Sequence, residues 1–448
     1  MSQTGSNVFQ RSIRAAMPMA VDGEGLYLID AEGNRYIDAS GGAAVSCLGH
    51  GDAQVVAAIQ EQAGKMAFAH TGFLTSEPTE ELAETLIDGA PDGIGWVYFV
   101  SGGSEAVESA LKMARQYFVI TGEEKRHHVI SRLQSYHGNT LGALTVGGHA
   151  RRRRPYLPIL GEAHHISPCY AYRGMADGES EEDYGLRVAG ELEDKILELG
   201  PETVSAFIAE TVVGATLGAV PAVKGYFKRI REICDKYGVL LILDEVMSGM
   251  GRTGTMHACE QEGIAPDLIC VAKGLGGGYQ PIGATLVSQN IFDAFRDGPG
   301  AFEHGHTYMG HAIACAAALA VQRAIVSRGL LENVVTQGEA LSNALNERFG
   351  NHHNIGDIRG RGLFRGLEIV ADRATREPFS ADLGIAGKLK KAAFARGLIC
   401  YPDNGTMDGD RGDHILLAPP FIIDADGLGE IVDKLGAAFD EVMSGIAE

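Results

Sequence analysis

Two apolar runs that each end near a charged residue constrain the fold of this chain more than any other feature. The first, Val239–Leu243, is followed by Asp244, and the second, Leu268–Val271, is followed closely by Lys273. Leu, Ile and Val runs without polar alternation are typical of strands buried on both faces of a parallel sheet. Lys273 follows Asp244 by 29 residues, which leaves room for one helix and the next strand. We therefore expect both side chains beyond the carboxyl ends of neighbouring strands, where ligands bind in open α/β sheets.

A carboxylate and an amine at that edge indicate a cofactor that uses both. Pyridoxal 5'-phosphate is such a cofactor, because a lysine forms its Schiff base and an aspartate pairs with its pyridinium nitrogen. Taken alone, Asp244 is also typical of a helix or turn cap, and Lys273 of a solvated surface lysine. Both alternatives are weakened because each residue follows an apolar strand.

A turn rich in glycine and serine, ahead of a predicted helix, is the candidate phosphate site. The turn, Ser101–Ser104, follows the apolar strand Val97–Val100. Backbone N–H groups at a helix start point outward and the helix dipole favours an anion, so Gly103 and Ser104 are the candidate ligands. A serine N-cap without any ligand explains the same turn about equally well.

Two further residues stand where a flat cofactor ring would be held between side chains. Tyr136, in a Tyr-His-Gly turn after a predicted strand, could lie over one face of a ring, and Val246 could contact the other. Each is, on its own, more typical of core packing. The position of Val246 two residues beyond Asp244 is what favours a role in the site.

Helices alternate with apolar strands from about Glu80 to Val326, a rhythm that predicts an α/β domain with a doubly wound, mainly parallel sheet. We place this large cofactor-binding domain at residues 66–326. An N-terminal arm and part of a small domain precede it at 1–65, and the small α+β domain is completed at 327–448. Further expected elements are a hairpin over Gly25–Asp38, helices over Asp52–Lys65, Ala312–Val326 and Ile385–Ala395, and a strand over Gly362–Val370.

Composition restricts the partners and the compartment. A formal net charge of -20 argues against nucleic acid and anionic membranes, because binding to phosphates needs a surplus of Lys and Arg. Seven scattered cysteines without a Cys-x-x-Cys pair predict free buried thiols in a reducing compartment. The polar N-terminus has no signal-peptide core and no apolar stretch approaches the span of a bilayer, so we expect a cytoplasmic protein.

Taken together, these motifs resemble the class III pyridoxal-phosphate-dependent aminotransferases, in particular the ω-amino acid and amine transaminases of fold type I. The resemblance is most specific at Leu243–Val246, Gly251–Gly254 and Ala272–Gly274, and it extends from Tyr36 to Pro420. It implies transfer of an amino group from an ω-amino acid, an amine or a diamino acid to pyruvate or 2-oxoglutarate by a ping-pong mechanism. Decarboxylases, aminomutases and racemases built on the same frame remain the alternative.

The resemblance also implies roles for individual residues. It makes Lys273 the Schiff-base lysine and Asp244 the partner of the pyridine nitrogen. Gly103 and Ser104 match the phosphate-binding turn, Tyr136 the residue stacked on the ring and Val246 the residue on its other face. Thr307 matches a threonine that reaches the phosphate of the neighbouring subunit, which implies a homodimer with shared active sites, or a tetramer.

The substrate pocket departs from the usual pattern. Arg411 falls near the family's mobile arginine that pairs with substrate carboxylates, after a loop that is longer than usual. Ala43 and Ala44 stand where many amine transaminases carry a bulky aromatic residue, and Phe73 is expected to wall the other side.

For two other polar clusters, the sequence predicts no catalytic role. The Arg151–Arg154 run is expected to be a solvated or intersubunit patch. We expect no metal site, because His164 and His165 lack carboxylate or cysteine ligands at metal spacing, and we interpret them as structural.

Overall fold

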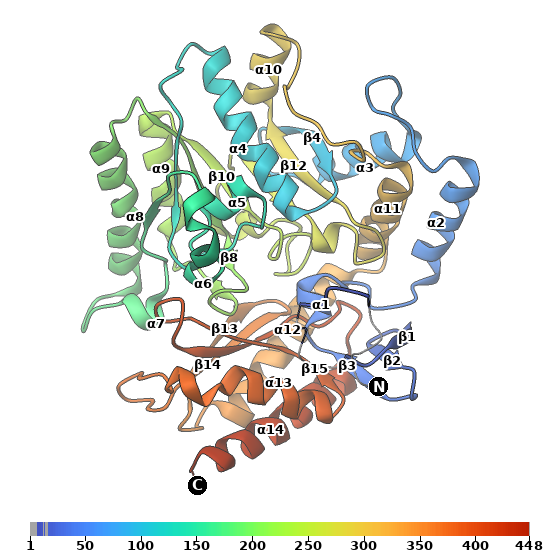
Figure 1. Ribbon diagram of the computed structural model, residues 1–448, viewed down its shortest axis with the longest axis vertical. Coiled ribbons are helices and arrows are strands. Elements are labelled where there is room, and N and C mark those ends of the chain that lie inside the picture. The colour runs from blue at the N-terminus through green and yellow to red at the C-terminus, as the bar shows by residue number, and fades with distance from the viewer. Residues whose placement is uncertain (1–6, 12, 14–16, 448) are drawn as a thin grey trace.

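The computed structural model describes residues 7–11, 13 and 17–447 of the chain, so the rest of the predicted N-terminal arm lies outside the described residues. Figure 1 shows a central sheet flanked by helices, above a smaller unit to which both ends of the chain contribute. The cofactor-site residues predicted from the sequence belong to the upper part, and the long C-terminal helix belongs to the lower one.

The main sheet has seven strands, and all neighbouring pairs are parallel except those made by β12, which is antiparallel to both neighbours. The prediction of a mainly parallel sheet is thus confirmed. In spatial order the strands are β4 (Ile94–Val100), β12 (Gly283–Ser288), β11 (Leu268–Val271), β10 (Leu240–Asp244), β7 (Val204–Glu210), β5 (His128–Arg132) and β6 (His164–Ile166).

The central strands lack polar alternation because both faces of the sheet are covered. Leu241 and Leu243 of β10 pack into one hydrophobic core with α8 and α9, whereas Leu240 and Ile242 pack into a second core with α4 and α10 on the opposite face. Each residue of β10 is therefore buried whichever way it points. The covering helices are α3 (Glu77–Asp88), α4 (Gly103–Ile120), α8 (Glu181–Leu199), α9 (Tyr226–Tyr237), α10 (Gln289–Asp297) and α11 (Ala312–Ser327).

The smaller unit joins the two ends of the chain. Its antiparallel sheet has the order β13 (Ile355–Arg361), β14 (Phe364–Ile369), β17 (Asp413–Leu417) and β16 (Tyr401–Asn404). A second sheet has the order β1 (Ala20–Glu24), β2 (Tyr27–Asp30), β3 (Arg35–Asp38) and β15 (Leu398–Ile399), so the expected hairpin pairs with a C-terminal strand. Its helices are α2 (Ala53–Lys65), α12 (Leu330–Phe349), α13 (Ile385–Ala395) and α14 (Ala425–Ala447).

Helix α11 contributes to both units. Ala314 and Ala318 pack into the core on one face of the main sheet, and Val321 and Ile325 pack into the core of the smaller unit. The predicted boundary at residue 326 falls next to the last residue of this helix, Ser327.

Short elements complete the chain between these helices and strands. They are α1 (Gly41–Ala44), α5 (Leu141–Val146), α6 (Ala150–Arg153), α7 (Ala171–Gly174), β8 (Val212–Val213), β9 (Val220–Pro221) and the 3₁₀ turns Arg154–Ile159, Ala258–Glu262, Lys273–Leu275 and Ala381–Leu383. All seven cysteines are buried and free, as expected.

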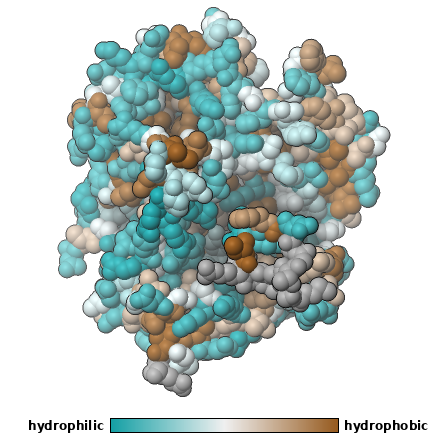
Figure 2. Space-filling view, in the orientation of Figure 1, coloured by the Kyte–Doolittle hydropathy of each residue, from teal (hydrophilic) through white to brown (hydrophobic). Residues whose placement is uncertain are grey.

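The face in Figure 2 is mostly hydrophilic, with hydrophobic residues in small separate groups. No single described helix is both long enough and apolar enough to cross a membrane. The pair α11 and α12 meets both requirements when taken together, but the two helices are bent by 67° relative to each other.

Candidate active site

Six predicted site residues meet at one cavity of about 380 Å³ beyond the carboxyl ends of the central strands. The strand register explains their meeting, because Asp244 of β10 pairs with Cys270 of β11, three residues before Lys273. The residues that the structure brings together are Gly103, Ser104, Tyr136, Asp244, Val246 and Lys273.

Asp244 is buried and held by two hydrogen bonds. Its Oδ2 accepts a hydrogen bond from His137 Nδ1 at 2.7 Å, and its Oδ1 accepts one from the backbone N–H of Val246 at 3.0 Å. His137 Nε2 is buried and has no hydrogen-bond partner among the described residues. The His137 ring therefore orients the carboxylate, a role that the sequence interpretation missed although it singled out the Tyr-His-Gly turn.

Glu210 is a second buried carboxylate in the cavity wall. It ends β7 directly beside Asp244, and its side chain accepts hydrogen bonds from the backbone N–H groups of Tyr136 at 3.0 Å and Gly214 at 2.9 Å. Burial raises the pKa of Glu210; the His137 charge opposes this shift, and the Asp244 charge adds to it. Glu210 thus positions the backbone of Tyr136, and sequence reasoning did not identify it.

Lys273 has an unusual backbone and a perturbed amine. Its φ is 47°, a left-handed conformation that side-chain-bearing residues seldom adopt, and such strain concentrates at functional sites. The peptide carbonyls that follow it are held by Gln322 of α11, whose amide donates to Gly274 O and Leu275 O. Burial lowers the pKa of Lys273 to about 8, against the opposing charges of Asp244 and Glu210 and together with the charge of Arg152.

The start of α4 also lines the cavity. A Cβ on Gly103 would lie 2.8 Å from Val246 Cγ1, so only glycine allows the helix start to approach Val246 so closely. The Ser104 hydroxyl accepts a hydrogen bond from the backbone N–H of Asn139 at 3.0 Å. Since the unpaired N–H groups of a helix start favour an anion, this part of the cavity suits a phosphate.

An unpredicted arginine, Arg152 of α6, lies beside the cavity. Its guanidinium carbon is 4.7 Å from the centre of the Tyr136 ring, and its charge reaches Lys273 strongly enough to lower the pKa of the lysine. No carboxylate among the described residues pairs with Arg152, whereas Arg151 pairs with Asp403 and Arg154 with Asp410. Arg152 and Arg153 are half-buried whereas Arg151 and Arg154 are exposed, so the expected solvated or intersubunit patch includes one arginine that lies beside the cavity.

Four predicted site residues are not brought to the cavity of their own chain. Thr307 and Phe73 are exposed, and the Phe73 side chain is 87% accessible because its loop extends away from the sheet. Ala44 is buried behind the cavity wall, packed with Met247 and Phe364, while its neighbour Val45 lines the wall instead. Arg411 lies on an exposed turn and bonds Asp408 at 2.7 Å.

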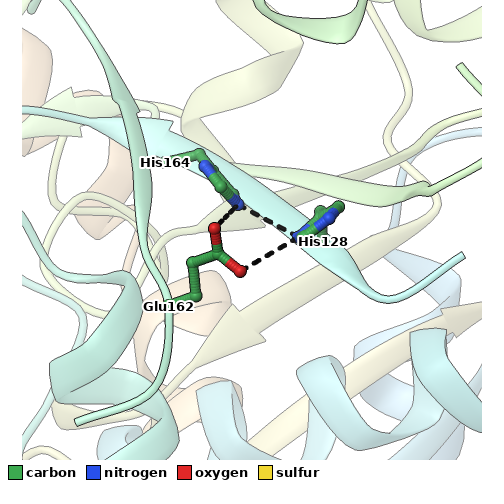
Figure 3. Close-up of side chains that lie close together, drawn as sticks. All are labelled: His128, Glu162 and His164. Atoms are coloured by element: carbon green, nitrogen blue, oxygen red, sulfur yellow. Dashed lines mark hydrogen bonds and ion pairs between the residues drawn. The ribbon is translucent and has the colours of Figure 1, made fainter. Parts of the chain in front are cut away.

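The interpretation of His164 as lacking a carboxylate at metal spacing is also wrong. Glu162, two residues earlier, places Oε1 3.6 Å from His164 Nε2, and the adjacent strand places His128 Nδ1 3.0 Å from the same nitrogen (Figure 3). His165, by contrast, bonds the backbone carbonyl of Gly147 at 3.1 Å, as a structural histidine would.

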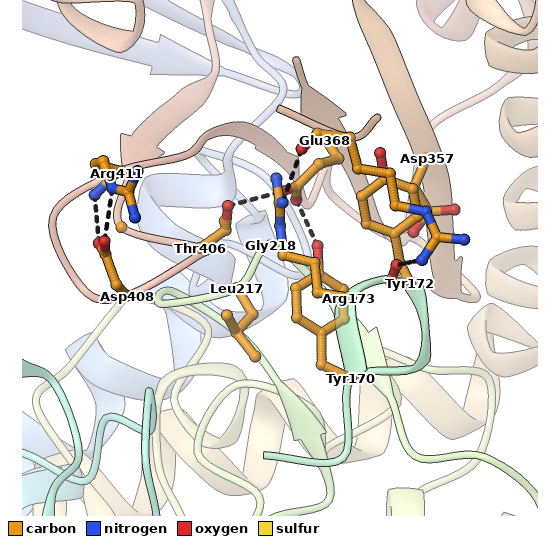
Figure 4. A network of polar contacts seen from close by, with 12 residues as sticks. Tyr170, Tyr172, Arg173, Leu217, Gly218, Asp357, Glu368, Thr406, Asp408 and Arg411 are labelled. Carbon is orange, nitrogen blue, oxygen red and sulfur yellow. Dashed lines mark hydrogen bonds and ion pairs between the residues drawn. The ribbon is translucent and has the colours of Figure 1, made fainter. Parts of the chain in front are cut away.

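A buried ionic network explains where the loop that carries Arg411 lies. Glu368 of β14 is fully buried and bonds Arg173 at 2.7 Å, Arg359 at 2.8 Å and the hydroxyl of Thr406 at 2.6 Å (Figure 4). Gln134 anchors the same loop by donating to Thr406 O at 2.7 Å. Because Thr406 is fixed from both sides, the turn beyond it holds Arg411 at the surface.

The donor set of the cavity fits a phosphorylated ring cofactor. The buried carboxylate of Asp244 can pair with a protonated ring nitrogen, and the buried amine of Lys273 can react with a carbonyl carbon. The N–H groups at the start of α4 can bind the phosphate. The three features are contributed by β10, by the residues after β11 and by α4, so all of them are fixed by regular structure.

Comparison with known proteins supports this interpretation of the cavity. Residues 9–439 match the family described as aminotransferase class-III. An uncharacterized aminotransferase of Schizosaccharomyces pombe is 47% identical over 99% of this chain and 97% of its own length. The diaminobutyrate–2-oxoglutarate transaminase of Halomonas elongata is 35% identical over 94% of this chain and 89% of its own.

Solved structures agree with the sequence relatives. The omega transaminase from Pseudomonas jessenii, in complex with PMP, superposes with a TM-score of 0.91 at 34% identity, covering 96% of this chain and 94% of its own. The similarity therefore covers the whole arrangement of strands and helices that forms the cavity.

Proposed function

This chain belongs to the class III aminotransferases and has the type I fold of their pyridoxal-phosphate enzymes, and we propose that it transfers an amino group from an amine, an ω-amino acid or a diamino acid to an α-keto acid. Pyruvate and 2-oxoglutarate are the proposed acceptors. The observation that carries the proposal is the presence of Lys273 and Asp244 at the ends of neighbouring strands in one cavity.

We propose pyridoxal 5'-phosphate as the cofactor. Lys273 would hold it covalently, Asp244 would pair with its ring nitrogen, and Gly103 and Ser104 would hold its phosphate. Tyr136 and Val246 line the same cavity and would hold the two faces of the ring. When bound, the cofactor supplies an electrophilic carbonyl and a sink for the electrons of the substrate's C–H bond.

The residues of the chain supply the proton transfer and its orientation. Burial lowers the pKa of Lys273 to about 8, nearer to neutral pH than that of an ordinary lysine, so Lys273 Nζ is suited to take a proton from the carbon that bears the substrate amine. Asp244 is kept in one orientation by His137 and by the backbone of Val246. Glu210 fixes the Tyr136 backbone, so the cavity wall stays in place while the proton moves.

We propose that Arg152, rather than Arg411, binds the substrate carboxylate. Arg152 lies on the Tyr136 ring at the cavity and has no carboxylate partner among the described residues, so its guanidinium is available for a bidentate anion. Arg411 is already paired with Asp408, and the anchored Thr406 loop holds it at the surface.

Arg152→Ala is expected to raise the KM for the α-keto acid by about 10- to 100-fold, the cost of losing a charge-assisted hydrogen bond. The KM of an amine donor without a carboxylate should change little, because such a donor presents no anion to Arg152. Steady-state kinetics with both co-substrates measure the difference. Arg154→Ala is the matched control, since that neighbour pairs with Asp410 at the surface. A large KM effect in Arg411→Ala and none in Arg152→Ala would return the role to Arg411.

We also propose a homodimer with shared active sites, with a tetramer as a further assembly. Thr307 is exposed outside the cavity of its own chain, which leaves it available to a neighbouring phosphate. Two neighbouring loops also expose apolar side chains, namely Phe73, Leu74 and Tyr308. The loops meet where Phe68 packs on the Tyr308 ring. Such an apolar surface is typical of an interface. Sedimentation of the purified protein tests this, and a monomer at micromolar concentration would contradict it.

The transfer reaction itself is tested by incubating the loaded enzyme with a donor alone. A transaminase releases one equivalent of oxo product per site and then stops until a keto acid is added. A racemase would instead return the other enantiomer, and a decarboxylase would release carbon dioxide without stopping. A screen of β-alanine, 4-aminobutyrate, diamino acids and simple amines in this format identifies the donor.

A further inference from the structure

Two histidines and one glutamate form a cluster at the edge of the main sheet, outside the active-site cavity. His128 begins β5, His164 begins the edge strand β6, and Glu162 lies in the loop just before it. His164 pairs with Ile130 in the parallel ladder, so His128, two residues before Ile130, points to the same face of the sheet. The cluster is at the amino ends of these strands, whereas the active-site cavity is at the carboxyl ends.

The polar atoms of the three side chains face one another (Figure 3). His128 Nδ1 and His164 Nε2 are 3.0 Å apart. Glu162 Oε2 is 3.9 Å from His128 Nδ1, and Glu162 Oε1 is 3.6 Å from His164 Nε2. A tetrahedral zinc site with bonds of about 2.0–2.1 Å separates neighbouring ligand atoms by about 3.3–3.4 Å. The two Glu162 distances involve different oxygens, and one ligand atom from each of the three residues lies within 4.8 Å of the other two. A rotation of the Glu162 carboxylate would therefore be needed to complete one face of the tetrahedron.

Without a metal, the Glu162 carboxylate makes no hydrogen bond to either histidine of the cluster. One imidazole can donate to the other across 3.0 Å, but both Glu162 separations exceed hydrogen-bond length. The two rings are largely buried, with exposed side-chain fractions of 17% and 12%, whereas the Glu162 side chain is 69% exposed. The rings are therefore held in place, and the exposed carboxylate is free to rotate toward them.

The groups next to the cluster are held by partners of their own. The His127 ring packs on His128 with centroids 4.1 Å apart and is itself fixed by its Nδ1, 2.6 Å from the carbonyl of Lys125. Two cations beside the adjacent cavity are engaged elsewhere, Lys112 with Glu108 and Arg115 with backbone carbonyls.

We propose that His128, Glu162 and His164 form a binding site for a divalent transition metal of the zinc type, with water completing the tetrahedron on the exposed side. Carboxylate and imidazole ligands suit Zn²⁺ and not the oxygen-only coordination of Ca²⁺ or Mg²⁺. The metal would join the start of β5 to the loop that leads into the edge strand β6. The proposal is independent of the aminotransferase assignment, since none of the three residues lines the active-site cavity.

The test is a titration of the metal-free, cofactor-loaded enzyme with ZnCl₂ by calorimetry, together with the metal content after dialysis. The expected result is one zinc ion per chain. His164→Gln and Glu162→Gln should each weaken binding by more than about 10-fold, the loss seen even when a supporting residue of a metal site is removed. Cobalt substitution should give the visible absorption of a tetrahedral site in the wild type and not in His164→Gln.

A second histidine pair provides the matched control. His352 and His353 stack with centroids 4.7 Å apart on another part of the molecule, so His353→Gln removes a surface imidazole without touching the cluster. Zinc binding should survive in that variant. Binding that is equal in the wild type and His164→Gln, or that is lost in His353→Gln, would overturn the proposal, as would a wild type that binds no zinc. Transaminase activity should stay at the wild-type level in every variant, which separates this test from that of the enzyme's function.

Discussion

Lys273→Ala is expected to lower kcat by on the order of 10³-fold, within the range of a lost proton-transfer group. The amine lines the cavity, and burial lowers its pKa to about 8, so it can accept a proton near neutral pH. Neighbouring Asp244 and Glu210 are fixed by hydrogen bonds to His137 and to backbone N–H groups, so they are not free to replace it. Single-turnover rates with a saturating donor measure the chemical step without product release.

The control for this variant is Lys224→Ala, which removes an exposed lysine outside the cavity and should retain wild-type turnover. Added methylamine should restore part of the lost rate in Lys273→Ala, because a small amine can enter the space that the side chain leaves. Retention of more than a tenth of the wild-type rate, without added amine, would sink the assignment of Lys273 as the proton-transfer group.

The centre of the site was predictable from the sequence because local rules place its residues. Asp244 and Lys273 each follow a strand that is buried on both faces, and parallel strands bring their carboxyl ends to the same edge. Gly103 and Ser104 begin a helix directly after β4, so the position of the helix start follows from the strand. These positions depend on the nearest element and on hydrophobic pattern, both of which can be read without a structure.

The residues around that centre depend on contacts between distant parts of the chain. Arg152 belongs to a run of four arginines, and only the packing of α6 against Tyr136 distinguishes it from its neighbours. Arg411 has a promising sequence position, but Thr406 and Gln134 hold its loop away from the cavity. The sequence contains no local signal for either outcome.

The histidine cluster also depends on contacts between distant parts of the chain. His128 and His164 are 36 residues apart, and their meeting is a consequence of the pairing between β5 and β6. Glu162 does stand two residues before His164, so attention to a Glu-x-His pattern would have supplied two of the three ligands. The remaining ligand needed the strand order of the sheet.

Glu368→Gln is expected to destabilise the protein by about 3–5 kcal/mol, the usual cost of removing one partner from a buried ion pair. Glu368 is inaccessible to solvent and pairs with two arginines, Arg173 and Arg359. The glutamine amide would leave Arg173 without a carboxylate partner among the described residues and would leave Arg359 paired with Asp357 alone. Burial alone would raise the pKa of Glu368, but the charges of Arg359 and Arg173, with the Thr406 hydrogen bond, bring it below the ordinary value of 4.5. Urea unfolding of both proteins at pH 7, followed by tryptophan fluorescence and circular dichroism, measures the difference.

The pH dependence gives the same prediction an independent check. A carboxylate whose folded pKa is depressed contributes stability that is fully present above its unfolded pKa and is lost as the pH falls through the folded pKa. The wild type should therefore begin to lose its advantage over Glu368→Gln as the pH falls below about 4.5, the unfolded value, and should lose it fully once the pH passes the lower folded pKa, where the folded carboxylate also becomes neutral. Glu179→Gln, which removes a carboxylate from a surface pair with Arg187, should leave the unfolding midpoint nearly unchanged at pH 7. Equal midpoints for Glu368→Gln and Glu179→Gln would mean that the network around Glu368 does not anchor the loop that carries Thr406 and Arg411.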